Sequence, residues 1–156
     1  MSDIKNIEVN NLQPANFTVL FDKLPGVEFH LKQIPLPTIT LASAELGTMD
    51  VALKVPSDVL SYEPATIMFT VDEKADNWDS IHDWMLEFRH KNLDWESMMS
   101  DASILIKDGN LDIVKEYRYE SCFPITLSEV TMSYSDETPS YDCSVTLMYD
   151  KFYKVK

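Results

Sequence analysis

The chain has 156 residues, which suits one domain, and its 45% apolar content is enough for a core of its own. Acidic residues outnumber basic ones 26 to 13, and the net charge of -13 disfavours binding to a phosphate backbone. Three glycines are too few for phosphate-cradling loops, and no apolar run is long enough to span a bilayer, so we expect a soluble, non-exported protein without a membrane partner.

The first residues predict a partner-dependent arm and then a single domain. Residues 1–15 are polar and read as an N-terminal arm, and residues 16–156 form the expected domain. A strand is predicted at 17–21. Apolar residues at every second position of 27–31 predict another strand, and the intervening Leu-Pro-Gly turn predicts that the two form a hairpin.

A proline-marked segment follows, from Ile34 to Pro64. Its apolar residues still alternate as in strands, whereas a proline cannot donate a ladder hydrogen bond and therefore suits an edge or a strand start. We expect a long extended arm with a functional role, because long excursions from compact domains are usually functional. An ordinary meander with irregular loops stays open as the alternative.

The next segment predicts a strand and then the chain's one amphipathic helix. Residues 65–71 alternate with Ile67 and Phe69 on one face. Asp76 or Asn77 is expected to cap the helix, Asp79 and Asp83 suit its positive end, and basic residues 89–91 suit its negative end. The apolar stripe recurs at helical spacing and consists of Trp78, Ile81, Trp84, Met85 and Phe88.

Strands resume after a stretch, 92–101, that reads as a short helical turn with Trp95 and Met98. Residues 103–107 and 111–119 flank Asp108-Gly109-Asn110, a strong hairpin signal because glycine and asparagine tolerate positive φ.

The last third, 122–153, contains two strand-like runs around a polar turn. In the second run, every other residue from Tyr141 to Tyr149 is apolar, which predicts one buried face and one small polar face. The predicted fold is a β-rich α+β domain, an antiparallel barrel or sandwich whose single helix lies across the sheet or at its end.

No catalytic or metal-binding chemistry emerges from the residue pattern. Cys122 and Cys143 lack a metal-ligand spacing and read as free, buried thiols in a reducing compartment. The histidines at 30, 82 and 90 have no catalytic spacing, and Asp79 with His82 supplies too few ligands for zinc. We therefore expect no enzyme, no metal and no cofactor. Free sheet edges and extended arms instead point towards assembly.

With these residues in view, the chain resembles the tail tube proteins of contractile-tailed bacteriophages of the T-even type. The strongest part is residues 123–132 followed by 145–150, which are similar to the family's terminal pattern of aromatic, proline, strand, polar turn and closing strand. Residues 70–73 with Trp84 resemble the family's strand, acidic turn and tryptophan-bearing helix. The early part, Phe17–Phe21 and then 24–25 and 34–37, is similar as well.

The resemblance implies a noncatalytic virion protein, assembled in the host cytoplasm, whose hexameric rings stack into the tail tube that conducts DNA. Implied partners are further copies of itself, the tail sheath protein, the baseplate and tail terminator proteins, and genomic DNA that passes without tight binding. Acidic residues facing the lumen would repel the DNA phosphates. Candidate lumen-facing residues are Thr66, Thr70, Glu129, Thr131, Ser133, Ser144 and Thr146, and the candidate ring-stacking arm carries Glu45, Asp50, Lys54 and Asp58.

Two alternatives stay open at this point. One is a minor component with the tube fold at the baseplate or the head-proximal end of the tail. The other is a monomeric module that binds a peptide in its helix groove or along a strand edge.

Overall fold

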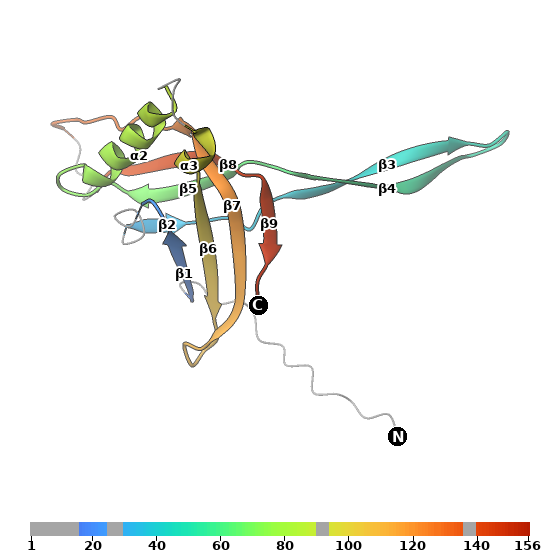
Figure 1. The fold of residues 1–156 in the computed structure, drawn as a ribbon, viewed down its shortest axis with the longest axis horizontal. Coiled ribbons are helices and arrows are strands. Elements are labelled where there is room, and N and C mark those ends of the chain that lie inside the picture. Colours follow the sequence, from blue (N-terminus) through green and yellow to red (C-terminus); the bar gives the residue numbers. More distant parts are fainter. Residues whose placement is uncertain (1–15, 25–29, 90–93, 136–139) are drawn as a thin grey trace.

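The computed structural model in Figure 1 describes residues 16–24, 30–89, 94–135 and 140–156. The expected N-terminal arm, residues 1–15, lies outside the described residues, as do His90 and Lys91. The described elements are β1 (Phe17–Phe21), β2 (Leu31–Gln33), β3 (Ile39–Gly47), β4 (Ala52–Tyr62), β5 (Ala65–Thr70), α2 (Asp76–Glu87), α3 (Trp95–Met98), β6 (Ser100–Lys107), β7 (Ile113–Leu127), β8 (Asp142–Met148) and β9 (Lys151–Lys154).

The body is built from one antiparallel, seven-stranded sheet in the order β1-β6-β7-β8-β5-β2, with β9 beside β7. In Figure 1, β5 and β8 run across the view while β6 and β9 run down it, so the sheet folds into two layers. Its end strands β1 and β2 do not pair with each other in the described chain. The predicted β-rich α+β class is confirmed, and the sheet is sandwich-like rather than closed into a barrel.

Strand β7 makes the corner between the two layers. Its residues up to Cys122 pair with β6, whereas residues 123–127 pair with β8. Between these two ladders, Ser121 has φ 58, a left-handed conformation that L residues seldom adopt, and its N–H donates to Asp101 Oδ1 at 3.0 Å. A bulge opposite Asp101 and this hydrogen bond therefore fix the place where the sheet turns.

The core lies between the layers and confirms the predicted strand alternation. Cys143, Val145 and Leu147 of β8 are buried beside Ile67 and Phe69 of β5. Both thiols are free and buried, as expected from the sequence. Helix α2 closes one end of the core, and the indole Nε1 of its Trp84 donates to the Met98 carbonyl at 2.6 Å, which ties α2 to the expected short turn α3.

The start of α2 differs from the prediction. Ala75 is the N-cap, with φ 58, and the N–H of Asp76 donates to Asp72 Oδ1 at 2.7 Å. Asp76 and Asn77 therefore lie inside the helix, because the tight turn begins before them and brings the Asp72 carboxylate to the free N–H. The expected acidic first turn is confirmed for Asp79, which Asp76 joins, whereas Asp83 lies beyond the first turn and the last turn holds no basic residue.

The described residues of the predicted first hairpin have long-range partners. Strand β1 pairs with β6, and Leu31 and Gln33 of β2 pair with β5. Most of the expected second strand, residues 27–29, lies outside the described residues, as do residues 25–26 of the expected turn. The pairing of β1 with β6 is favoured because it places Val19 and Phe21 beside Ile104 and Ala102 in the core.

The hairpin of β6 and β7 is confirmed, with a different turn chemistry. Among the described residues the positive φ falls on Leu111, at 67°, and on neither Gly109 nor Asn110. Asp108 Oδ1 accepts hydrogen bonds from the N–H groups of Asn110 and Asp112 at 2.9 and 3.0 Å. The turn is therefore organised by the Asp108 carboxylate, with the left-handed residue placed after the expected dipeptide.

Candidate assembly surfaces

The outward face of the sheet carries a row of hydroxyl groups that we call the polar face. Thr66 pairs with Thr146, which pairs with Thr126, so that three threonines lie side by side across β5, β8 and β7. The hydroxyl oxygens of Thr66 and Thr146 share a hydrogen bond of 3.1 Å. The next pair along the ladder is Met68 with Ser144.

The polar face ends in a compensated pair of charges. Lys32 Nζ donates to Asp142 Oδ2 at 2.8 Å, and the Thr70 hydroxyl donates to Asp142 Oδ1 at 3.2 Å. The ammonium and the hydroxyl hold the pKa of the exposed Asp142 carboxyl below its usual value. The polar face is therefore close to neutral, although the whole chain carries a charge of -13.

The structure brings four of the seven candidate lumen residues together and separates the others. Thr66, Thr70, Ser144 and Thr146 share the polar face. The strand prediction for Glu129, Thr131 and Ser133 is wrong because β7 ends at Leu127, and these three exposed residues lie on the following loop.

Thr126, Lys32 and Asp142 belong to the same face and were missed from the sequence. The sequence places Thr126 and Ser128 at alternate positions, but Ser128 Oγ lies 3.2 Å from the buried Cys143 Sγ, so that only Thr126 of the two belongs to the polar face. The register with β8 shifts at a bulge around Ile125. This bulge decides whether the odd-numbered or the even-numbered residues at the end of β7 face outward.

The second surface is the hairpin arm, formed by β3 and β4. Figure 1 shows this two-stranded ribbon extending far from the body, and every residue of β3 is exposed. The prediction of a long extended arm between Ile34 and Pro64 is confirmed, and the irregular meander is not. Glu45 lies opposite Lys54, whereas Asp50 lies at the tip and Asp58 in a bulge between the two ladders of the arm.

The register of the arm gives it two separate apolar patches. In the root ladder, nearest the body, Ile39 and Leu41 pair with Tyr62 and Leu60, and these four residues are the root patch. In the tip ladder, Ala44 and Leu46 pair with Val55 and Leu53 and form the tip patch on the opposite face of the ribbon. The bulge opposite Ala42 lies between the two patches.

Two tyrosines, the buried Tyr119 and the half-buried Tyr149, anchor the arm to the body. The Tyr149 hydroxyl donates to the Glu63 carbonyl at 2.7 Å, and the Tyr119 hydroxyl donates to the Pro35 carbonyl at 2.6 Å. Tyr62 packs edge-on against Tyr149, with ring centroids 6.3 Å apart. Burial raises the pKa of Tyr149 to about 12 and also raises the pKa of Tyr119. Both phenols therefore stay protonated as donors, which fixes the base of the arm.

Chemical sites are not evident in the part of the chain that the structure describes. No group of three or more His, Cys, Asp or Glu side chains there is arranged to hold a metal ion. The His82 ring lies on the Trp78 ring, with centroids 5.3 Å apart, and not in a ligand cluster with Asp79. Within the same described ranges, no helix is long and apolar enough to cross a membrane.

Comparison with known proteins finds similarity to components of phage tails and contractile injection systems. No family model matches the chain. The tail tube terminator protein of Enterobacteria phage T4 is 25% identical over 155 residues, covering 92% of this chain and 88% of that protein.

Two solved structures share the fold over nearly the whole chain. The tube-terminating cap of the anti-feeding prophage matches with a TM-score of 0.69 and 13% identity, covering 93% of this chain and 91% of that one. The sheath/tube terminator of the extracellular contractile injection system PVC also matches with a TM-score of 0.69, at 14% identity, covering 94% and 98%. These relatives are components of phage tails or contractile injection systems and not enzymes.

Proposed function

We propose that this protein is a structural component of a contractile tail or injection system that forms a ring and ends the inner tube. The observation that carries the proposal is the likeness to a tail tube terminator protein over 92% of the chain, together with two terminators of the same fold. This function corresponds to the minor-component alternative of the sequence analysis. It replaces the expectation of rings that stack along the whole tube.

The geometry offers what ring formation requires. Among the described residues the sheet is open, with β1 and β2 at its ends, and the end strands of a sheet can serve as templates for pairing with another copy. A ring, six-fold as the family resemblance implies, would pair these edges between neighbours and surround a lumen. The tube protein and the tail sheath protein are the remaining partners in this proposal, and the assembled virion tail is its location.

The polar face is the proposed wall of the lumen. Thr66, Thr126, Thr146 and Ser144 present small, uncharged groups, and Asp142 neutralises Lys32. Such a surface offers no unpaired cation to hold a DNA phosphate, so DNA can slide along it. Glu129, in the loop after β7, together with Thr131 and Ser133, is proposed to lie at the rim of the lumen, where its carboxylate would repel phosphate.

The experiment is controlled tube assembly. Tube protein is polymerised with and without this protein, and tube lengths are measured by negative-stain electron microscopy. We expect this protein to form rings, to stop elongation, and to need about one ring per tube end. The variant Leu46→Asp should assemble more weakly, whereas Ser61→Asp, on the polar side of the arm root, serves as the matched control.

Two results would contradict the proposal. Unlimited tubes formed by this protein alone would assign it to the tube itself. A protein that stays monomeric at high concentration, even when tube protein is present, would favour the peptide-binding module.

A further inference from the structure

The apolar side chains at the tip of the hairpin arm are exposed to solvent in the described structure. Leu46 and Leu53 of the tip patch are 57% and 53% exposed, and Val51 beside them is 60% exposed. A two-stranded hairpin standing alone is marginal in water, and exposed apolar groups of this size stabilise a contact when a partner buries them. The arm is therefore built to lie on another surface.

Charge restricts which surface that is. Residues 39–62 carry the acids Glu45, Asp50 and Asp58 against the single base Lys54, a net charge of -2. Since the whole chain has a charge of -13, most of the surface of a second copy would repel the arm. A docking surface on a second copy must therefore be both apolar and locally positive.

One part of the body meets both conditions, and we call it the basic end: residues 105–118 at the β6–β7 hairpin and residues 151–156 at β9. It holds six of the 13 basic residues of the chain against three acidic ones, a net charge of +3. The bases are Lys107, Lys115, Arg118, Lys151, Lys154 and Lys156. The N–H of Val155 donates to the Glu116 carbonyl at 2.8 Å, which holds the two segments side by side.

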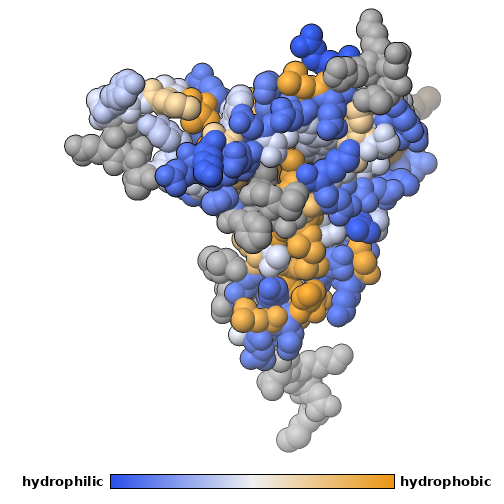
Figure 2. All heavy atoms as spheres, turned by 60° about the vertical axis from the view of Figure 1, so that its left-hand side comes forward, coloured by the Kyte–Doolittle hydropathy of each residue, from blue (hydrophilic) through white to orange (hydrophobic). Residues whose placement is uncertain are grey.

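Apolar side chains are exposed at this end of the body, where Val114 and Tyr153 have the outward parity of Arg118 and Lys151, whereas Lys154 has the opposite parity. Ile113 and Val114 of β7 are 41% and 48% exposed, and Tyr153 and Val155 are 39% and 49% exposed. Figure 2 shows hydrophobic side chains reaching the surface among hydrophilic ones on the lower part of the body. This combination of groups complements an acidic, apolar ribbon.

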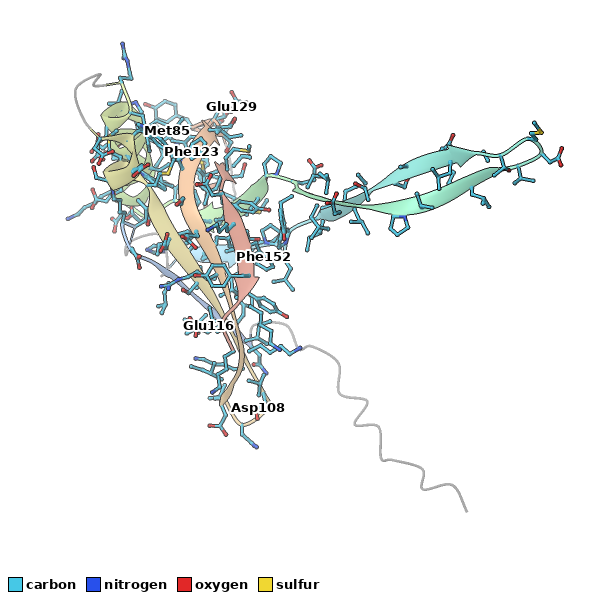
Figure 3. The ribbon with its side chains drawn as sticks, turned by 45° about the vertical axis from the view of Figure 1, so that its right-hand side comes forward. Met85, Asp108, Glu116, Phe123, Glu129 and Phe152 are labelled. Carbon is cyan, nitrogen blue, oxygen red and sulfur yellow. The ribbon has the colours of Figure 1, made fainter. Side chains whose placement is uncertain are left out.

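We propose that the tip patch of the hairpin arm docks on the basic end of a second copy of this chain. Figure 3 shows the hairpin arm leading away from Asp108, Glu116 and Phe152, so that, among the described residues, the arm does not cover the basic end of its own chain. Two different surfaces of one molecule then meet head to tail, the kind of contact that closes into a ring when the rotation allows it. The inference rests on the proposed ring function and names the contact that links neighbouring copies.

The first test is cross-linking between copies. Leu53→Cys in the tip patch and Val114→Cys in the basic end are combined in one chain and treated with a short bismaleimide; the native thiols are 1% and 2% exposed and should not react. We expect a ladder of covalent oligomers from the double variant and monomers from each single variant. Cross-links only to added tube protein, or none in rings seen by microscopy, would overturn the inference and leave the terminator function standing.

The second test is charge reversal with rescue, measured by sedimentation velocity. Lys151→Glu, on the face of Tyr153, should weaken self-association about tenfold, and adding Asp50→Lys to the same chain should restore it. Lys74→Glu, at an exposed lysine before α2, is the matched control and should change little. Equal effects of Lys151→Glu and Lys74→Glu, without rescue, would overturn the docking site, whereas a wild-type protein that never forms rings would overturn the proposed function itself.

Discussion

At the scale of single residues, the burial of protonated cysteine and tyrosine side chains makes the folded protein less stable at alkaline pH. Burial raises the pKa of Cys122 from 9.0 to about 12, and the pKa values of Tyr119 and Tyr149 are raised for the same reason. A group with a raised folded-state pKa contributes fully below its unfolded pKa, and this contribution is lost as pH rises through the folded value.

We therefore expect the free energy of unfolding to fall as pH rises from 8 towards 12. Cys122 alone should account for about 1 kcal/mol between pH 8 and pH 10. Urea denaturation at both pH values checks this, with Cys122→Ala expected to show the smaller pH difference. Val145→Ala opens a cavity without removing a titrating group and should keep the wild-type difference. A stability independent of pH over this range would contradict the prediction.

The buried side chain of Asn77 joins the end of β5 to the start of α2 by hydrogen bonds. It is buried, its Nδ2 donates to the Thr70 carbonyl at 2.8 Å, and its Oδ1 accepts from the N–H groups of Asp72 and Trp78 at 3.2 and 2.9 Å. Asn77→Ala leaves these groups without partners and should cost about 2 kcal/mol in urea denaturation. The exposed neighbour change Asp76→Ala should cost about 0.5 kcal/mol. Equal costs would show that the bridge from β5 to α2 is unimportant.

At the scale of elements, the β6–β7 turn contains strain that a substitution can remove. Leu111 has φ 67, is 67% exposed and loses little burial when it is replaced. Leu111→Gly should raise the free energy of unfolding by about 1 kcal/mol, because glycine adopts this φ without the Cβ clash. Gly109→Ala, in open space and without positive φ, should stay within about 0.5 kcal/mol. Destabilisation by Leu111→Gly in thermal or urea unfolding would refute the argument.

The hairpin arm is an element that the body should fold without. Replacing residues 42–59 by Asn-Gly joins Leu41 to its partner Leu60 through a tight turn and keeps the anchoring contacts of Tyr149 and Tyr119. We expect the unfolding midpoint in urea to be nearly unchanged and self-association to be lost. Loss of the folded body, seen by circular dichroism, would mean that the arm is part of the folding unit.

At the scale of the whole molecule, a net charge of -13 coexists with a nearly neutral polar face. If that face lines a lumen, a new cation on it should slow DNA passage, because each copy in the ring adds a phosphate contact. Thr146→Lys should reduce the rate of DNA ejection about tenfold in virions that carry the variant ring. Ser80→Lys, on the exposed side of α2, is the matched control. Equal ejection rates for both variants would place the lumen elsewhere.

Much of the local structure could be predicted from the sequence, because its signals are local. The period of two in β5 and β8 identified Ile67, Phe69, Val145 and Leu147 as buried, and the helical stripe identified Ile81 and Trp84. The prolines and alternation between Ile34 and Pro64 indicated the extended arm. Each of these signals depends only on residues a few positions apart.

Strand partners and outward faces required the tertiary structure. The partner of β1 is β6, about 85 residues further along the chain, and no short-range pattern records that pairing. Glu129, Thr131 and Ser133 were placed on a strand because the alternation of residue types continues past Leu127, where the ladder with β8 ends.

The sequence by itself determined the buried positions of β5, β8 and α2, where the helix runs and that an extended arm leaves the domain, since burial of apolar groups in these elements follows the local period. Only the tertiary structure decided the corner at Ser121, the neutral character of the polar face and the distance of the arm from the basic end. These features depend on contacts between distant segments: the Asp101 carboxylate that holds Ser121, and the Lys32 ammonium that neutralises Asp142.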